Sequence, residues 1–121
     1  MERLPHDSYC RKIGRVQGRD RDIPCNDDTK LLDAKSKDYY WYLPILKAQL
    51  DCHVGQLIVV PRTEAEVITV AAAVAKLRIP LTLRGGGTGN YGQCVPMQGG
   101  VILETTKLDR ILDISPGRVT C

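Results

Sequence analysis

The sequence predicts a small domain of mixed helices and strands, built around one β-α-β unit. Residues 57–60 form a short apolar run with β-branched side chains, which is typical of a buried strand. A capped amphipathic helix is predicted to follow, and residues 81–84 form a second apolar run that predicts the next strand. Because strands joined by a helix run parallel, the segment after residue 84 is expected at the carboxyl edge of a sheet. Open α/β sheets bind their ligands at that edge.

The predicted helix has recognisable signals at both ends. Thr63 and Glu66 form a capping box, in which side chains accept hydrogen bonds from N–H groups of the first turn. Pro80 is expected to end the helix, because proline disfavours the helical conformation in the residue before it. The apolar face expected to pack on the sheet consists of Val67, Val70, Ala71, Val74 and Leu77.

Residues 1–37 are polar and weakly patterned, and prolines and glycines interrupt them. They predict a poorly ordered arm with one short helix at residues 29–35. A basic arm that contacts phosphate is the alternative, but acidic residues nearly cancel its charge. The basic residues are Arg11, Lys12, Arg15 and Arg19, and the acidic residues that follow are Asp20, Asp22, Asp27 and Asp28.

Residues 38–54 are predicted to form a lead-in helix region. Four consecutive aromatic residues begin at Tyr39, and Pro44 fits the first turn of a helix, where its missing N–H group costs nothing. The preferred interpretation is that apolar groups here pack against the domain, and an aromatic wall for a ring-shaped ligand is the alternative. One helical face would carry Leu43, Leu46 and Leu50.

Further elements are predicted toward the end of the chain. Residues 101–104 form another apolar run and predict a strand. The apolar spacing in residues 108–112 predicts one short helical turn, and Ser-Pro-Gly at residues 115–117 predicts a turn. Residues 119–121 have the pattern of a strand that is cut off.

Composition and charge exclude several classes of function. The net charge is +3, from 17 basic and 14 acidic residues, which is too small to indicate a nucleic-acid-binding protein. No apolar run is long enough to span a membrane, and no signal-peptide hydrophobic region begins the chain. The five cysteines include no C-x-x-C pair, so they indicate reduced thiols in a cytoplasmic protein. Cys52 and His53 alone cannot fill a tetrahedral site, so no metal is expected.

The candidate site is the loop after residue 84, and the sequence from Leu81 is LTLRGGGTGNYGQ. Glycine lets the backbone reach positive φ and lets a ligand approach closely. A row of glycines leaves successive N–H groups unshielded, and such groups form an anion-binding nest when they point into one concavity. The glycines of this loop are Gly85, Gly86, Gly87, Gly89 and Gly92.

Other interpretations of the loop compete with this one. Gly87, Gly89 and Gly92 match the dinucleotide-binding fingerprint of Rossmann-type modules. That fingerprint needs a helix to open at the loop, and the chain runs into Pro96 instead. The phosphate loop of nucleotide triphosphatases needs a lysine where Gln93 stands. A glycine-rich surface loop without a ligand is the third possibility.

The loop and its flanks resemble a known family. Pro-Arg-Thr-Glu-Ala-Glu-Val occupies residues 61–67, Arg-Gly-Gly-Gly-Thr-Gly occupies 84–89, and Gly-Val-Ile-Leu occupies 100–103. From about residue 57 onward, the chain resembles the N-terminal part of the FAD-binding domain of the vanillyl-alcohol oxidase/p-cresol methylhydroxylase (PCMH) flavoprotein superfamily. It is most similar to the FAD-linked oxidase branch, the glycolate oxidase and D-lactate dehydrogenase group.

The resemblance implies an α+β fold, in which FAD lies between a parallel-sheet subdomain and a largely antiparallel one. Residues 55–121 would then be a partial FAD-binding domain, namely its N-terminal β-α-β subdomain, incomplete at the C-terminus. The loop would wrap the pyrophosphate of FAD with N–H groups, and Thr88 and Asn90 would add side-chain hydrogen bonds. The implied cofactor-binding residues are Arg84, Gly85, Gly86, Gly87, Thr88, Gly89, Asn90 and Gly92.

The resemblance also implies a flavin-dependent oxidoreductase acting on a small hydroxylated substrate, often a 2-hydroxy acid. Some members bind FAD covalently through a histidine in this loop. Thr88 stands at that position here, so non-covalent FAD is expected. The family's catalytic residues lie in later segments, so none is named, and the chain alone is expected to be inactive. A truncated remnant without a ligand is the competing hypothesis, and the substrate, electron acceptor and oligomeric state stay open.

Overall fold

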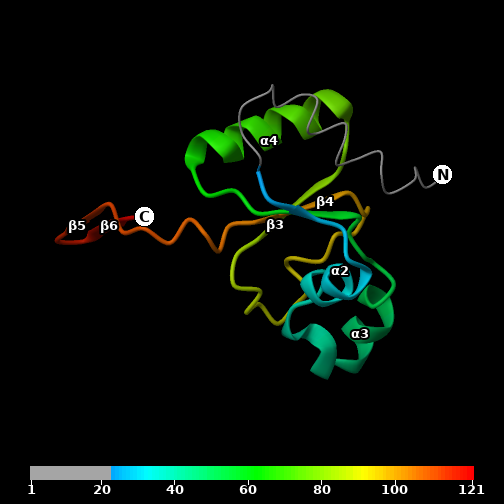
Figure 1. Cartoon of the computed structure of the whole chain (residues 1–121). Helices are drawn as coiled ribbons and strands as arrows, with labels where there is room; N and C mark the ends of the chain where they lie inside the picture. Colours follow the sequence, from blue (N-terminus) through cyan, green and yellow to red (C-terminus); the bar gives the residue numbers. More distant parts are fainter. Residues whose placement is uncertain (1–22) are drawn as a thin grey trace.

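The structure, a computed structural model, describes residues 23–121 (Figure 1). Within them, one sheet contains four strands in the order β1-β2-β4-β3. The strands β2, β4 and β3 are parallel, whereas β1 runs antiparallel to β2. The carboxyl ends of the parallel strands therefore lie at one edge of the sheet. The strands are β1 (Cys25–Asn26), β2 (Leu57–Val59), β3 (Leu81–Arg84) and β4 (Val101–Glu104).

Helices lie on both sides of this sheet, with α4 on one side and α2 and α3 on the other (Figure 1). Val70 and Val74 of α4 pack on one face, in a core that includes Leu57 and Val59 of β2. Ile58, between those two residues, packs with Leu32 of α2 on the other face. The apolar runs of β2 and β4 are buried because both of their faces are covered, whereas Leu81 and Leu83 of the edge strand β3 are exposed. The helices are α2 (Thr29–Lys35), the 3-10 helix η1 (Tyr39–Tyr42), α3 (Pro44–Leu50) and α4 (Glu64–Leu77).

The predicted β-α-β unit is confirmed as β2, α4 and β3, with β4 inserted between the two strands. Thr63 caps α4, because its hydroxyl accepts a hydrogen bond from the N–H of Glu66 at 3.3 Å. The Glu66 carboxylate accepts one from the N–H of Arg62 at 2.6 Å. The other end of α4 is set by Arg78, whose left-handed conformation (φ 53°) turns the chain out of the helix. The helix has therefore already ended before Pro80.

The described part of the expected arm is folded. Residues 29–35 form α2 as predicted, and Asp28 caps it by accepting a hydrogen bond from the N–H of Leu31 at 2.9 Å. The expectation of poor order is wrong for residues 23–37, because Ile23 and Leu32 enter the two cores. The basic cluster lies outside the described residues, and the division of the chain at residues 37 and 54 stays a prediction.

The chain after β4 differs from expectation. The helical turn predicted at residues 108–112 is absent from the structure, where a turn from Thr105 to Leu108 is followed by extended chain. Ile111 and Leu112 are exposed, so a helix here would have no surface to pack against. β5 (Asp113–Ser115) and β6 (Arg118–Thr120) then form an antiparallel hairpin around the predicted turn, and it stands away from the sheet (Figure 1).

Among the helices of residues 23–121, none is long and apolar enough to cross a membrane.

Candidate functional site

The glycine loop (residues 85–92) leaves the carboxyl edge of the sheet at the end of β3. No helix occurs in residues 85–100 of the described chain, so the loop does not open into the helix that a Rossmann-type site needs. Thr88 and Asn90 are exposed, as are Gly85 and Gly86. Among residues 23–121, no hydrogen bond uses the N–H groups of residues 85–90. This run of consecutive donors is therefore open to a ligand.

The glycines of the loop serve different purposes. Gly87 and Gly92 have positive φ values of 69° and 79°, which other residues rarely adopt. A Cβ atom at Gly87 would also lie 2.0 Å from Nη2 of Arg84. At Gly86 an added Cβ would meet only the Thr88 methyl, at 3.6 Å, and at Gly85 it would meet no described atom within 4 Å. The fold thus needs glycine at residue 87 but leaves open space beside residues 85 and 86.

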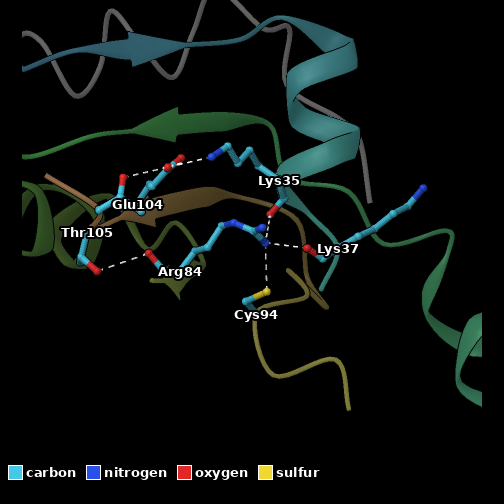
Figure 2. Close-up of polar contacts among 7 residues, drawn as sticks. Lys35, Lys37, Arg84, Cys94, Glu104 and Thr105 are labelled. Atoms are coloured by element: carbon cyan, nitrogen blue, oxygen red, sulfur yellow. Dashed lines mark hydrogen bonds and ion pairs between the residues drawn. The ribbon is translucent and has the colours of Figure 1, made fainter. Parts of the chain in front are cut away.

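The side chain of Arg84 turns into the protein rather than out toward solvent (Figure 2). Its Nη1 donates hydrogen bonds to the carbonyl oxygens of Lys35 (2.9 Å) and Lys37 (2.6 Å) and contacts Sγ of Cys94 at 3.1 Å. Its Nε is buried without a partner among the described residues. None of the ion pairs within residues 23–121 includes Arg84. A positive charge that is held by carbonyl oxygens rather than by a direct ion pair therefore lies against the loop at Gly87.

Glu104 lies beside Arg84, because the two are register partners in β4 and β3. Its carboxylate accepts a hydrogen bond from Nζ of Lys35 at 2.8 Å (Figure 2). It accepts another from the hydroxyl of Thr106 at 2.9 Å. Burial acts to raise the pKa of Glu104, but these two hydrogen bonds and the charges of Lys35 and Arg84 outweigh it and lower the pKa. The carboxylate is therefore charged at neutral pH and joins α2 to the sheet.

Cys94 is the only thiol that touches this group among the described residues. Burial raises its pKa, although the charge of Arg84 opposes the shift. The thiol is therefore protonated at neutral pH, which makes it a poor nucleophile.

Asp38 holds the far end of the loop. Its Oδ1 accepts hydrogen bonds from the N–H groups of Tyr40 (3.0 Å) and Gly92 (3.2 Å), and its Oδ2 accepts one from the N–H of Gln93 (3.0 Å). The N–H of Tyr39 donates to the carbonyl of Gly89 at 2.8 Å. Asp38 is 5% exposed, so these hydrogen bonds are shielded from water. The segment before α3 therefore fixes the loop from residue 89 to residue 93.

A small apolar cluster packs beside the contact between Asp38 and the loop. Tyr40, Leu50 and Val95 are buried together, which confirms packing as the role of Tyr40 in the aromatic run. The Tyr40 hydroxyl donates to Asp51 at 3.1 Å, and Asp51 pairs with Lys47. Burial, followed by the Asp51 hydrogen bond and nearby carboxylates, raises the pKa of Tyr40 to about 12. This tyrosine is therefore a neutral packing residue.

The sequence predicted residues 84–92 as the site but missed Asp38 and Lys35. Asp38 contacts Gly92 across 54 positions and Lys35 contacts Glu104 across 69 positions of the sequence. No local pattern marks such contacts. The one hint in the sequence was that Asp38 stands just before the aromatic run. An acidic residue there is also expected simply as a helix cap, so it did not indicate a contact with the loop.

Comparison with known proteins agrees with this geometry. The model of the FAD binding domain family matches residues 55–121. Over 60 residues the chain is 38% identical to glycolate oxidase subunit GlcD of Escherichia coli K12. These aligned residues make up 50% of this chain and 12% of that protein. Over 64 residues it is 36% identical to an uncharacterized oxidoreductase, ORF5 of the fasciation locus of Rhodococcoides fascians, covering 53% of this chain and 14% of that protein. The chain thus spans only a small part of the length of these relatives.

The fold is shared with solved structures of alkyldihydroxyacetonephosphate synthase. One of them superposes with a TM-score of 0.71 at 16% identity, covering 90% of this chain and 23% of that one. A second gives a TM-score of 0.70 at 15% identity. The predicted α+β, PCMH-type fold is confirmed by the family match together with these structures. The chain belongs to the FAD-binding domain family, as a PCMH-type domain of the FAD-linked oxidases.

Proposed function

We propose that residues 84–92 bind the diphosphate of FAD without a covalent bond. The observation that carries this proposal is the run of N–H groups at residues 85–90, which no described hydrogen bond uses although both ends of the loop are held. Four of these residues are exposed, and Gly87 and Gly89 are half-buried. A diphosphate needs many directed donors and little side-chain bulk. The open space beside Gly85 and Gly86 supplies the second requirement.

Three features of the loop fit a diphosphate. The exposed side chains of Thr88 and Asn90 add donors on the solvent side. The charge of Arg84 lies on the protein side, against Gly87, and would attract an anion without touching it. Thr88 occupies the position of the covalent histidine in other members, and a threonine cannot form that bond, which supports dissociable FAD.

We further propose that the chain is one part of a flavin-dependent oxidoreductase for small hydroxylated substrates of the 2-hydroxy acid class. Bound FAD would supply the hydride acceptor, and the protein would supply its position and electrostatics. The glycolate oxidase relative supports this substrate class, and the chain covers 12% of that protein. Since no described side chain is assigned to a substrate, we expect the 121 residues alone to be inactive.

Amide NMR spectroscopy of the chain tests the loop assignment, since it detects weak binding residue by residue. We expect FAD, and ADP as a diphosphate without a flavin, to shift the amide signals of residues 85–90. Riboflavin, which lacks phosphate, should not shift them, and Gly117 in the β5–β6 hairpin serves as the internal control. If millimolar FAD leaves the loop signals unchanged, the loop of this chain does not bind the diphosphate and the proposal is wrong.

The variant Gly86→Val sharpens this test. Its side chain would extend into the open space beside the loop, so we expect the fold to persist and the FAD response to be lost. The control Ala72→Val places the same valine side chain on the exposed side of α4 and should leave the FAD response unchanged. An unchanged FAD response in Gly86→Val would contradict the proposed site.

A further inference from the structure

The two ends of the glycine loop are held by one short segment of the chain, residues 35–40. At the start of the loop, Arg84 donates to the carbonyl oxygens of Lys35 and Lys37. At the end of the loop, Asp38 accepts from the N–H groups of Gly92 and Gln93. Hydrogen bonds therefore tie both ends of the loop to this segment, and the unused N–H donors of residues 85–90 lie between the two attachments.

We propose that Asp38 is a positioning residue for FAD: it fixes the second half of the glycine loop in the shape that receives the diphosphate. This inference rests on the proposed function of the loop. Asp38 would not touch the cofactor, because its two carboxylate oxygens are already occupied by three N–H groups of the protein. It would act by setting where residues 89–93 lie.

The physical reason is the entropy of a glycine-rich segment. Glycine backbones have more conformations to lose than any other residue, so an untethered loop with this sequence would populate many shapes. If a loop holds the competent shape for only a fraction of the time, the apparent Kd rises by the reciprocal of that fraction. Buried hydrogen bonds to a charged carboxylate are among the stronger ties available to hold such a loop.

The charge of Asp38 makes the sign of the effect diagnostic. A carboxylate repels a diphosphate, so removing its charge should strengthen FAD binding if electrostatics alone mattered. A positioning role predicts the opposite, namely weaker FAD binding when the charge is removed. The two roles of this residue can therefore be separated by the direction of the change in affinity.

Asp38 also caps η1 through the N–H of Tyr40, and a suitable variant separates that structural role from positioning. Asp38→Ser keeps a short oxygen that can cap η1, since serine is a preferred cap, but it is too short to bond Gly92 and Gln93 as well. Asp38→Asn keeps the size but replaces one acceptor oxygen by a donor group. The matched control is Asp33→Asn, which removes the same charge from an exposed position of α2, where Asp33 pairs with Lys37.

The experiment uses the full chain and two NMR measurements. Without ligand, we expect faster amide hydrogen exchange at Gly92 and Gln93 in both Asp38 variants than in the wild type and in Asp33→Asn. With FAD, we expect the Kd to rise about tenfold in both variants if the released loop keeps the competent shape about a tenth of the time. Asp33→Asn should bind FAD as the wild type does, or slightly more tightly.

The outcomes separate this inference from the function on which it rests. If the loop signals of the wild type do not respond to FAD, the proposed function falls, and the role of Asp38 in binding falls with it. If the wild type responds and Asp38→Ser binds FAD equally well or more tightly, the loop assignment stands and the positioning role is overturned. Unchanged hydrogen exchange at Gly92 and Gln93 in both variants would also overturn it.

Discussion

Gly87→Ala should destabilise the domain far more than alanine at the neighbouring glycine. Gly87 has a φ of 69°, and forcing an alanine into the left-handed region costs about 1–2 kcal/mol. The new Cβ would lie 2.0 Å from Nη2 and 2.9 Å from Nη1 of Arg84, so the guanidinium must move. Hydrogen bonds to charged groups contribute about 1.5–3 kcal/mol each, and Nη1 makes two of them to carbonyl oxygens. Losing one of them brings the total cost to about 2.5–5 kcal/mol.

Urea unfolding followed by circular dichroism measures this free energy directly. The matched control is Gly86→Ala, whose Cβ meets only a methyl group at 3.6 Å and whose φ is not positive. That variant should be neutral or more stable by up to about 1 kcal/mol, because alanine restricts the unfolded chain. If Gly87→Ala unfolds within about 0.5 kcal/mol of Gly86→Ala, the contact between residue 87 and Arg84 does not support the loop and the reasoning fails.

Two further predictions concern the cofactor and the buried ion pair. Acid precipitation of a preparation loaded with FAD should release all of the yellow colour into the supernatant, and colour kept in the pellet would reveal a covalent link. Glu104→Gln should lose about 1–3 kcal/mol of stability at pH 7, because Lys35 then loses its charged partner. Since folding lowers the pKa of Glu104 from 4.5, the wild type should lose this advantage as the pH falls through the lowered value, and the two proteins should converge in acid. Asp113→Asn, which removes the exposed ion pair with Arg118, should change little, and an equal loss in that control would refute the assignment.

Local signals in the sequence accounted for much of the fold. The apolar, largely β-branched run at residues 57–60 and the capping residue Thr63 identified β2 and the start of α4 because both depend on neighbours in sequence. The helix at residues 29–35 followed for the same reason. The predicted turn at residues 108–112 failed because apolar spacing says nothing about whether a surface exists to cover it, and Ile111 is 62% exposed.

The composition of the candidate site was predictable and its construction was not. Five glycines after a strand indicated a loop that exposes its backbone, and the unused N–H groups agree with that prediction. The sequence did not show that Arg84 would bond the carbonyl of Lys35, 49 positions away, or that Asp38 would bond Gly92. Such contacts depend on how α2 docks against the sheet, which no pattern within either segment records.

The strand order has a consequence for the synthesis of the protein. Within residues 23–121, β3 pairs only with β4, and β4 also separates β3 from β2. As the chain emerges from a ribosome, β2 and β3 therefore cannot join one sheet until residues 101–104 arrive. The glycine loop between β3 and β4 would be joined to the sheet at both ends at that moment, when Glu104 also meets Lys35. Until then the apolar strands stay exposed, which makes this interval the one in which a chaperone would protect the nascent chain most.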